Sequence, residues 1–553
     1  MIEIRNFIKI YEESFADNWD LPALTYYPTG KTITYGEMAK DIAAMHLFFK
    51  SIGLMPGDKV ALCGRDTVEW VKIYMGVITY GAVIVPILCD FNPIDVTHIV
   101  NHSEAALFFV TESVWEHMEP ENFLNVRGVL SIERFKLLHE RENQEMGRDM
   151  KLLSRRFKSH HKHGFTAADI HYANRDNSEL AEINYTSGTT GFSKGVMLSG
   201  RNLAGNVCFG IDSGLHFKTS RALSFLPLAH AYACAFDMLT PLAVGSHITL
   251  LGKTPSPRVL IKAMAEVRPN LVICVPLILE KIYKNQILPM ISKGPVRWTL
   301  AVPFLDSLIY AKIRRRLIEV FGGEFEEVIV GGAPLNHEVE EFLHKIKFPF
   351  TVGYGMTECG PLISYAPWRQ ARPGSCGRVV DRMEVKVDSP DRTTVPGVIW
   401  VKGENVMLGY YKNDEATAQV FDADGWMTTG DIGCVDDDNF IYLRGRDKNM
   451  ILGPSGQNIY PEEIEQKLNN MLFVSESVVI DDAGRLVALI HPDLDLLTQH
   501  QIGSEELQQI MADNISQLNK ELPSYSQISK FDLMSEEFEK TPKRSIKRYL
   551  YQR

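Results

Sequence analysis

The chain has 553 residues, of which 45% are hydrophobic and 23% are charged, and its formal net charge is −11. This composition is typical of a globular protein with more than one domain, and it excludes a collagen-like or low-complexity chain. The negative charge argues against binding nucleic acid through bulk positive charge, so we expect no nucleic-acid partner. The eight cysteines form no CxxC pair, which favours reduced thiols in a cytoplasmic protein over a zinc ribbon.

The first part of the chain alternates between helix-like and strand-like segments. Residues 35–51 have the apolar spacing of a helix, and a turn and a strand follow at 54–62. A second helix is expected over 70–80 and a β-rich run over 82–88, a pattern that indicates parallel α/β packing. The most apolar stretch, 71–89, includes a lysine, a glycine and a proline, which favours a buried helix and strand over a membrane span.

A charged stretch over 133–165 is expected to form a helical insertion with an exposed loop. Its three histidines, His160, His161 and His163, could bind a metal ion, but a solvated loop is the favoured interpretation. Alternation between strands and helices returns over 168–365, with strand-like runs such as ALSFLPL and EEVIVGG.

The last part of the chain divides into a β-rich segment and a C-terminal unit. From 374 to 445 the sequence has short strands, Gly and Asp turns and little helix, which predicts a small β subdomain. A helix, a hairpin and a helix over 504–521 follow, so we place a domain boundary at 446. The predicted fold is α/β: an N-terminal domain over 1–445, with two sheet-and-helix subdomains and the β subdomain, and a smaller α+β C-terminal domain over 446–553.

The sharpest motif is a loop rich in Gly, Ser and Thr between a predicted strand and a predicted helix, YTSGTTGFSKG at Tyr185–Gly195. Its glycines permit tight turns, while its hydroxyls, free amides and lysine can donate to phosphate oxygens. It is not a Walker loop, because Ser193 and Gly195 stand where that motif needs a glycine and a Ser or Thr. The residues expected to bind phosphate are Thr186, Ser187, Gly188, Thr189, Thr190, Gly191 and Lys194.

This loop resembles the phosphate loop of the adenylate-forming enzymes, a superfamily of acyl-CoA synthetases, firefly-type luciferases and adenylation domains of peptide synthetases. Further motifs match in the same order, and the resemblance extends over residues 26–549: GGAPL at Gly331–Leu335, YGMTE at Tyr354–Glu358, TGD at Thr429–Asp431 and RGRDKNMI with Arg446. It implies a mobile C-terminal domain with its hinge at Lys448. The residues that it implies for the nucleotide are Gly332, Ala333, Pro334, Tyr354, Gly355, Met356, Thr357, Asp431 and Arg446.

The side chains suit these implied roles. Glu358 is expected to bind Mg²⁺ with Thr186, because Mg²⁺ prefers hard oxygen ligands together with phosphate. Tyr354 offers a flat ring for adenine, and Asp431 can accept hydrogen bonds from both ribose hydroxyls. Arg446 is a permanent donor for ribose or phosphate.

Two weaker matches concern the acyl group. His230, in LPLAHAYA, resembles the histidine beside the reacting carboxylate, although a buried structural histidine remains the alternative. The segments VPLILEKIYK at Val275–Lys284 and GSCGR at Gly374–Arg378 resemble those of long-chain fatty acyl-CoA synthetases, with Leu277 in place of the usual arginine. The catalytic residues implied by the resemblance are Glu358, Lys194 and His230.

The resemblance implies ATP-dependent activation of a medium- or long-chain fatty acid to an acyl-adenylate and then to an acyl-CoA. ATP, Mg²⁺ and CoA are the expected cofactors and co-substrates. Two alternatives stay open: a ligase that loads a carrier protein, and an adenylate-binding protein with impaired adenylation. The expected location is cytoplasmic, and a peripheral membrane contact also stays open.

The second alternative comes from a mismatch near the C-terminus. The superfamily usually ends in a segment like KTxxGKxxR, whose second lysine contacts the reacting carboxylate and the α-phosphate. Here the chain reads KTPKRSIKR over 540–548, which places Ser545 at the lysine position. Lys543 and Lys547 lie two residues away on either side, and either one could take the role after a small backbone shift.

Overall fold

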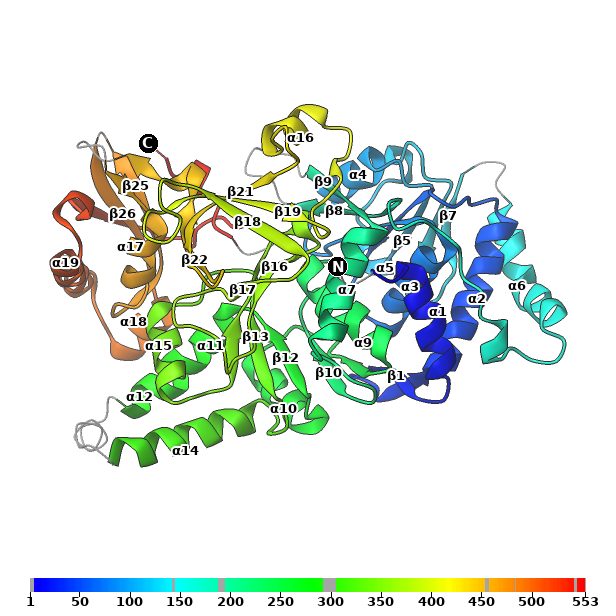
Figure 1. The fold of residues 1–553 in the computed structure, drawn as a ribbon, viewed down its shortest axis with the longest axis horizontal. Helices are drawn as coiled ribbons and strands as arrows, with labels where there is room; N and C mark the ends of the chain where they lie inside the picture. Colours follow the sequence, from blue (N-terminus) through cyan, green and yellow to red (C-terminus); the bar gives the residue numbers. More distant parts are fainter. Residues whose placement is uncertain are drawn as a thin grey trace.

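The structure of the chain is a computed structural model that describes residues 4–141, 145–186, 194–291, 305–452, 457–482, 484–541 and 545–552. Along its longest axis the N-terminal segments lie at one end and the C-terminal unit lies at the other (Figure 1). The predicted α/β class is confirmed, since the chain forms two sheet-and-helix units, a smaller β unit and a C-terminal unit.

The first sheet has eight strands, of which the five central ones run parallel. The strands β3, β4, β5 and β6 are buried along nearly their whole length, as expected for parallel strands that helices cover on both faces. In spatial order the strands are β20 (Gly409–Tyr410), β9 (Lys194–Ser199), β8 (Leu180–Thr186), β4 (Val83–Ile87), β3 (Lys59–Cys63), β5 (Leu107–Val110), β6 (Gly128–Ser131) and β7 (Leu137–Glu140).

Helices pack on this sheet where the sequence predicts them. The helix α2 (Tyr35–Ser51) begins at a capping box, in which Thr34 and Glu37 satisfy each other's backbone amides. The apolar stretch 71–89 is a helix, α3 (Val68–Tyr80), followed by β4, so the prediction of a buried helix and strand is confirmed. No helix in the described ranges is long and apolar enough to cross a bilayer. Three further helices in this region are α4 (Pro93–His102), α5 (Glu112–Trp115) and α6 (Met146–His160).

The second sheet has seven strands, and all neighbours are parallel except β1 and β2. Its strands in order are β14 (Phe350–Val352), β13 (Glu327–Val330), β12 (Leu271–Cys274), β10 (Arg221–Ser224), β11 (His247–Leu250), β1 (Pro22–Tyr26) and β2 (Lys31–Thr34). One continuous core of buried side chains joins both sheets. Helices of this region are α1 (Phe7–Asp17), α7 (Gly200–Asp212), α8 (Ala231–Ala233), α9 (Thr240–Val244), α10 (Pro257–Val267), α11 (Pro276–Ile282), α12 (Leu288–Ile291), α14 (Leu305–Val320) and α15 (His337–Lys345).

The β unit is antiparallel, and its long strands follow the order β18, β19, β21, β22. The predicted hairpin is β18 (Met383–Asp388) paired with β19 (Gly397–Gly403). The bounds of its other elements are β15 (Tyr354–Gly355), β16 (Leu362–Tyr365), β17 (Arg378–Val379), α16 (Asp414–Val420), β21 (Met427–Val435) and β22 (Ile441–Arg446).

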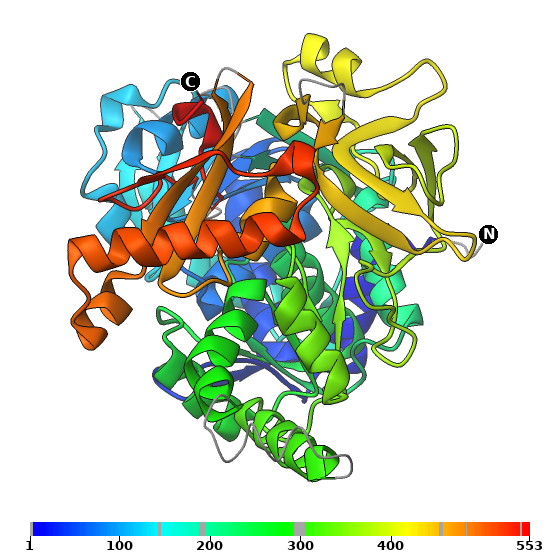
Figure 2. The same ribbon diagram turned by 90° about the vertical axis from the view of Figure 1, so that its left-hand side faces the viewer.

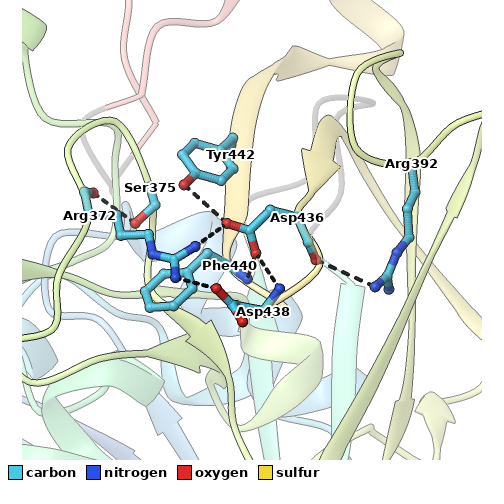
Figure 3. A network of polar contacts seen from close by, with 7 residues as sticks. All are labelled: Arg372, Ser375, Arg392, Asp436, Asp438, Phe440 and Tyr442. Carbon is cyan, nitrogen blue, oxygen red and sulfur yellow. Dashed lines mark hydrogen bonds and ion pairs between the residues drawn. The ribbon is translucent and has the colours of Figure 1, made fainter.

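A polar network ties Arg372, which lies just before the GSCGR segment, to the turn between β21 and β22 (Figure 3). The guanidinium of Arg372 donates to Asp436 at 2.6 Å, forms an ion pair with Asp438 and lies 4.1 Å from the centre of the Phe440 ring. The Asp436 carboxylate also accepts from the backbone N–H of Phe440 at 2.9 Å. The network therefore fixes the end of the hairpin that carries Asp431 and Arg446 at its other end.

The C-terminal unit has hydrophobic cores of its own, separate from the core of the two large sheets. The predicted hairpin and the helix over 504–521 appear as β25 with β26 and as α19, which lies in front of those strands in Figure 2. The boundary predicted at 446 coincides with the last residue of β22. The elements of this unit are β23 (Ile451–Leu452), β24 (Asn458–Ile459), α17 (Pro461–Leu468), β25 (Val474–Asp482), β26 (Arg485–Pro492), α18 (Leu494–His500), α19 (Ser504–Glu521) and β27 (Lys530–Leu533).

Candidate active site

The predicted phosphate loop connects two neighbouring antiparallel strands. Thr186 ends β8, and Lys194, which begins β9, is its partner in the ladder. Ser199 ends β9 and caps α7, so the chain runs from strand to helix as predicted. The loop residues expected to bind phosphate between these strands lie outside the described residues: Ser187, Gly188, Thr189, Thr190 and Gly191.

A tyrosine that sequence reasoning missed joins Lys194 to Glu358. The hydroxyl of Tyr410 donates to Glu358 Oε1 at 2.9 Å, and the Lys194 ammonium lies 4.6 Å from the centre of the same tyrosine ring. Glu358 is half-buried in a short 3₁₀ turn, and its backbone carbonyl accepts from Met407. Burial, with the nearby charge of Glu358, raises the pKa of Tyr410, so the hydroxyl stays protonated and donates.

The GGAPL motif forms an exposed loop after β13. Gly332 has φ +85°, a left-handed conformation that side chains disfavour, which explains the glycine. Ala333 and Pro334 are exposed, whereas Leu335 is buried and its carbonyl accepts from Gln466 of the C-terminal unit at 2.7 Å. The loop thus connects the second sheet to the C-terminal unit by a hydrogen bond.

Three of the predicted nucleotide residues meet around one carboxylate. The hydroxyl of Tyr354 donates to Asp431 Oδ2 at 2.5 Å, and Arg446 Nε lies 2.7 Å from Asp431 Oδ1. Burial raises the pKa of Asp431, while the charge of Arg446 and the hydrogen bond from Tyr354 oppose that shift. Asp431 and Arg446 are partners in the ladder of β21 and β22, so the hairpin register itself sets this contact.

The ring of Tyr354, which the sequence analysis assigns to adenine, is largely buried in the protein. Its side chain is only 7% exposed, and its hydroxyl is bound to Asp431, so it belongs to the packed interior as well as to the site. The following Gly355 is exposed, and a Cβ at that position would lie 2.2 Å from the carbonyl oxygen of Pro361. The backbone approach explains why the motif has a glycine there. Met356 and Thr357 continue into the turn that holds Glu358.

The segment with His230 is held by a half-buried acid, Asp66. His230 is half-buried and precedes the short helix α8, and the amide of Leu228, two residues earlier, donates to both carboxylate oxygens of Asp66 at 3.2 Å. Burial raises the pKa of Asp66 to about 7, although the hydrogen bond from the Leu228 amide opposes the shift. Tyr232 donates to the carbonyl of Ile329 at 3.1 Å, which ties this segment to β13.

The predicted hinge and lysines lie in or next to the C-terminal unit. Lys448 is in a 3₁₀ turn at Asp447–Asn449, directly after β22. The ammonium of Lys547 lies 3.2 Å from Glu539, and among the described residues no contact joins it to Glu358 or Lys194. Lys543 lies outside the described residues. Ser545 is exposed, and its amide donates to Thr541 Oγ1.

Comparison with known proteins places the chain in a family. A family model described as AMP-binding enzyme matches residues 11–411, and one described as AMP-binding enzyme C-terminal domain matches residues 448–553. The chain is 28% identical over 484 residues to the long-chain-fatty-acid–CoA ligase FadD15 of Mycobacterium bovis, covering 83% of this chain and 76% of the relative. It is 30% identical over 506 residues to the peroxisomal long chain acyl-CoA synthetase 6 of Arabidopsis thaliana, covering 84% and 69%.

Solved structures share the fold. ATP-bound MatB from Rhodopseudomonas palustris has a TM-score of 0.75 at 22% identity, with 98% of each chain covered. The anthranilate CoA ligase AuaEII with anthranoyl-AMP has a TM-score of 0.76 at 19% identity, with 100% of this chain and 97% of that chain covered. The chain therefore belongs to the AMP-binding enzyme family, which confirms the sequence-based prediction of an adenylate-forming ligase.

Proposed function

We propose that this protein is a fatty acyl-CoA synthetase that acts on medium- or long-chain fatty acids. In the first step a carboxylate oxygen attacks the α-phosphorus of ATP, an O–P bond forms, and the bond to pyrophosphate breaks. In the second step the sulfur of CoA attacks the acyl carbon and a C–S bond forms. The bond between the acyl carbon and the phosphate oxygen breaks, and AMP leaves. The observation that carries the proposal is the convergence of Lys194, Tyr410 and Glu358 at the strand ends that flank the phosphate loop.

The arrangement suits a reaction between two anions. A carboxylate and a triphosphate repel each other, so the site must supply positive charge where the bond forms. We assign this role to Lys194, whose ammonium the Tyr410 ring holds from one side by a cation–π contact. The hydroxyl of the same tyrosine orients Glu358, so one residue positions both charges.

The donor set fits Mg²⁺. Among the described residues no group of three or more His, Cys, Asp or Glu side chains could form a protein-only metal site. Mg²⁺ is commonly bound by one or two carboxylates together with substrate phosphates, and Glu358 with the hydroxyl of Thr186 at the end of β8 offers hard oxygen ligands of that kind. When bound there, Mg²⁺ would neutralise phosphate charge.

We assign the nucleoside to the cluster around Asp431. A carboxylate has about four acceptor positions, so Asp431 can receive Tyr354 and Arg446 and still accept from ribose hydroxyls. The exposed loop at Gly332, Ala333 and Pro334 is available to adenine. The residues Gly355, Met356 and Thr357 link the nucleoside side to Glu358.

We place the acyl group beside His230. The segment that follows it is largely apolar and buried, with Ala233, Phe236 and Met238 each at most 3% exposed, and it also contains one buried acid, Asp237. Mostly apolar surroundings of this kind suit a hydrocarbon chain. The relatives named as long-chain-fatty-acid–CoA ligases support the same substrate class. His230 would orient the carboxylate beside this segment.

The proposed acceptor of the acyl group is the thiol of CoA. CoA is favoured by the names of the relatives, and a carrier protein is the alternative. A specific observation keeps a second function open: the lysine position holds Ser545, and the ammonium of Lys547 is paired with Glu539. An adenylate-binding protein with slow adenylation would have this arrangement.

The test is ATP-dependent pyrophosphate release by the purified protein and by Glu358→Gln. This substitution keeps the shape of the side chain and removes its charge, and the loss of one such stabilising group typically lowers the rate by ~10²–10³-fold. Fatty-acid-dependent release that falls this far supports the assignment. Release that is unchanged in the variant would refute the role of Glu358, and an absolute requirement for a carrier protein in place of CoA would refute the acceptor.

A further inference from the structure

The helix α6 and the turn after it are strongly positive in a chain whose net charge is negative. Residues 146–163 contain six Lys and Arg residues and a single acidic residue, whereas the whole chain has a formal net charge of −11. Five of these cations recur at intervals of three and four residues, the spacing that places side chains on one face of a helix. We call this set the cationic face; it consists of Arg148, Lys151, Arg155, Lys158 and Lys162, and all five are exposed.

The opposite face of α6 is occupied by packing within the protein. Met146 is fully buried, and Met150 and Leu153 pack against the core. The Phe157 ring lies 5.9 Å from the ring of Phe165. The helix is therefore packed against the rest of the protein, and its apolar side is not available to insert into a lipid bilayer.

Most of the cationic face has no counterion among the residues that the structure describes. Arg148 lies 3.1 Å from Glu145, and the remaining arginine of the helix, Arg156, lies 2.6 Å from Asp149. Within the part of the chain that the structure describes, no ion pair holds the other four members of the face, Lys151, Arg155, Lys158 and Lys162. Like charges at these spacings repel one another, so the row is unfavourable by itself and becomes favourable next to an anionic surface.

We propose that the cationic face binds the surface of a lipid bilayer that contains anionic lipids. Interfaces between proteins centre on desolvated anchors, often aromatic, and the exposed side of α6 has no aromatic residue. Adsorption to a charged bilayer needs only a row of cations within a Debye length of the headgroups. This inference assigns a membrane-facing surface and does not depend on the substrate proposed above.

The place of α6 in the fold suits this contact. It lies at the end of the longest axis that is opposite to the C-terminal unit (Figure 1). A molecule that adsorbs through the cationic face therefore keeps the C-terminal unit away from the bilayer. Movement of that unit about the predicted hinge at Lys448 would then not require release from the membrane.

The proposal is tested by vesicle co-sedimentation of the full chain. The vesicles contain either equal parts of phosphatidylcholine and phosphatidylglycerol or phosphatidylcholine alone. We expect binding to the anionic vesicles only, and we expect it to be lost between about 0.1 M and about 1 M salt, where the Debye length falls from about 10 Å to about 3 Å. The triple variant Lys151→Gln, Arg155→Gln, Lys158→Gln should bind about 100-fold more weakly, because each cation contributes about fivefold.

A matched control removes three exposed cations elsewhere. The variant Lys312→Gln, Arg315→Gln, Arg316→Gln on α14 changes the net charge equally and should bind within about fivefold of the unmodified protein. Both variants should have the same melting temperature as the unmodified protein. Equal loss in both variants, equal binding to neutral vesicles, or binding through α6 to duplex DNA or an acidic carrier protein but not to vesicles would overturn the proposal.

Discussion

The hydroxyl of Tyr410 offers the sharpest perturbation of the proposed site. Tyr410→Phe removes the donor that lies 2.9 Å from Glu358 Oε1 and keeps the ring that lies 4.6 Å from the Lys194 ammonium. A hydrogen bond to a charged group contributes about 1.5–3 kcal/mol, so its loss in the transition state corresponds to roughly a 10- to 150-fold slower adenylation. Tyr410→Leu removes the ring too, and the lost cation–π contact should cost about 0.5–2 kcal/mol more.

The assay is carboxylate-dependent exchange between pyrophosphate and ATP, which reports the first step alone. The neighbouring Tyr411 supplies the matched control, because its hydroxyl donates to the exposed Glu104 at 2.7 Å and its backbone amide, which binds Gly195, is unaffected by the change to Phe. We expect Tyr411→Phe to retain full activity. The reasoning would be refuted by an unchanged exchange rate in Tyr410→Phe at an unchanged melting temperature, or by an equal loss in both variants.

Three further predictions concern the hinge, the C-terminal lysine and the half-buried acid Asp66. Lys448→Pro fixes φ and should slow thioester formation more than pyrophosphate exchange; equal effects on both steps would argue against a hinge there. Ser545→Lys should accelerate adenylation and leave thioester formation from supplied acyl-adenylate unchanged. This account of the segment would be contradicted if the unmodified protein adenylates rapidly and neither Lys543→Ala nor Lys547→Ala slows it. Asp66 has its pKa raised to about 7, so it binds more protons in the folded state and its contribution to stability falls as pH rises from about 4 to about 7. Asp66→Asn should remove that decline in urea unfolding across this interval, and identical pH profiles for the two proteins would show that Asp66 is not the cause.

Local patterns predicted much of the fold. The helix over 35–51, the apolar helix and strand within 71–89, and the helix over 504–521 are all encoded by neighbouring residues, and the structure has them there. The family could be recognised for the same reason, because each of its motifs is short and continuous. The hairpin of β21 and β22 then brings Asp431 to Arg446 through register alone.

Contacts between distant segments could not be predicted in this way. Tyr410 lies beside Lys194 because β20 pairs with β9, more than two hundred residues earlier, and no local pattern in GYYKN predicts that pairing. Asp66 binds Leu228 through a similarly distant contact. The burial of Tyr354 also depends on the β unit, since its hydroxyl partner Asp431 comes from another hairpin.

The most direct test of the central proposal is pyrophosphate release by the purified protein against carboxylates of graded length, with and without CoA. The account predicts release that requires ATP and a fatty acid, rises from short to medium or long chains, and yields acyl-CoA only when CoA is present. Release with aromatic or dicarboxylic acids but not with fatty acids would contradict the proposed substrate. Absence of release with every acid tested, while the protein still binds a stable acyl-adenylate analogue, would contradict the proposed activity and favour the adenylate-binding alternative.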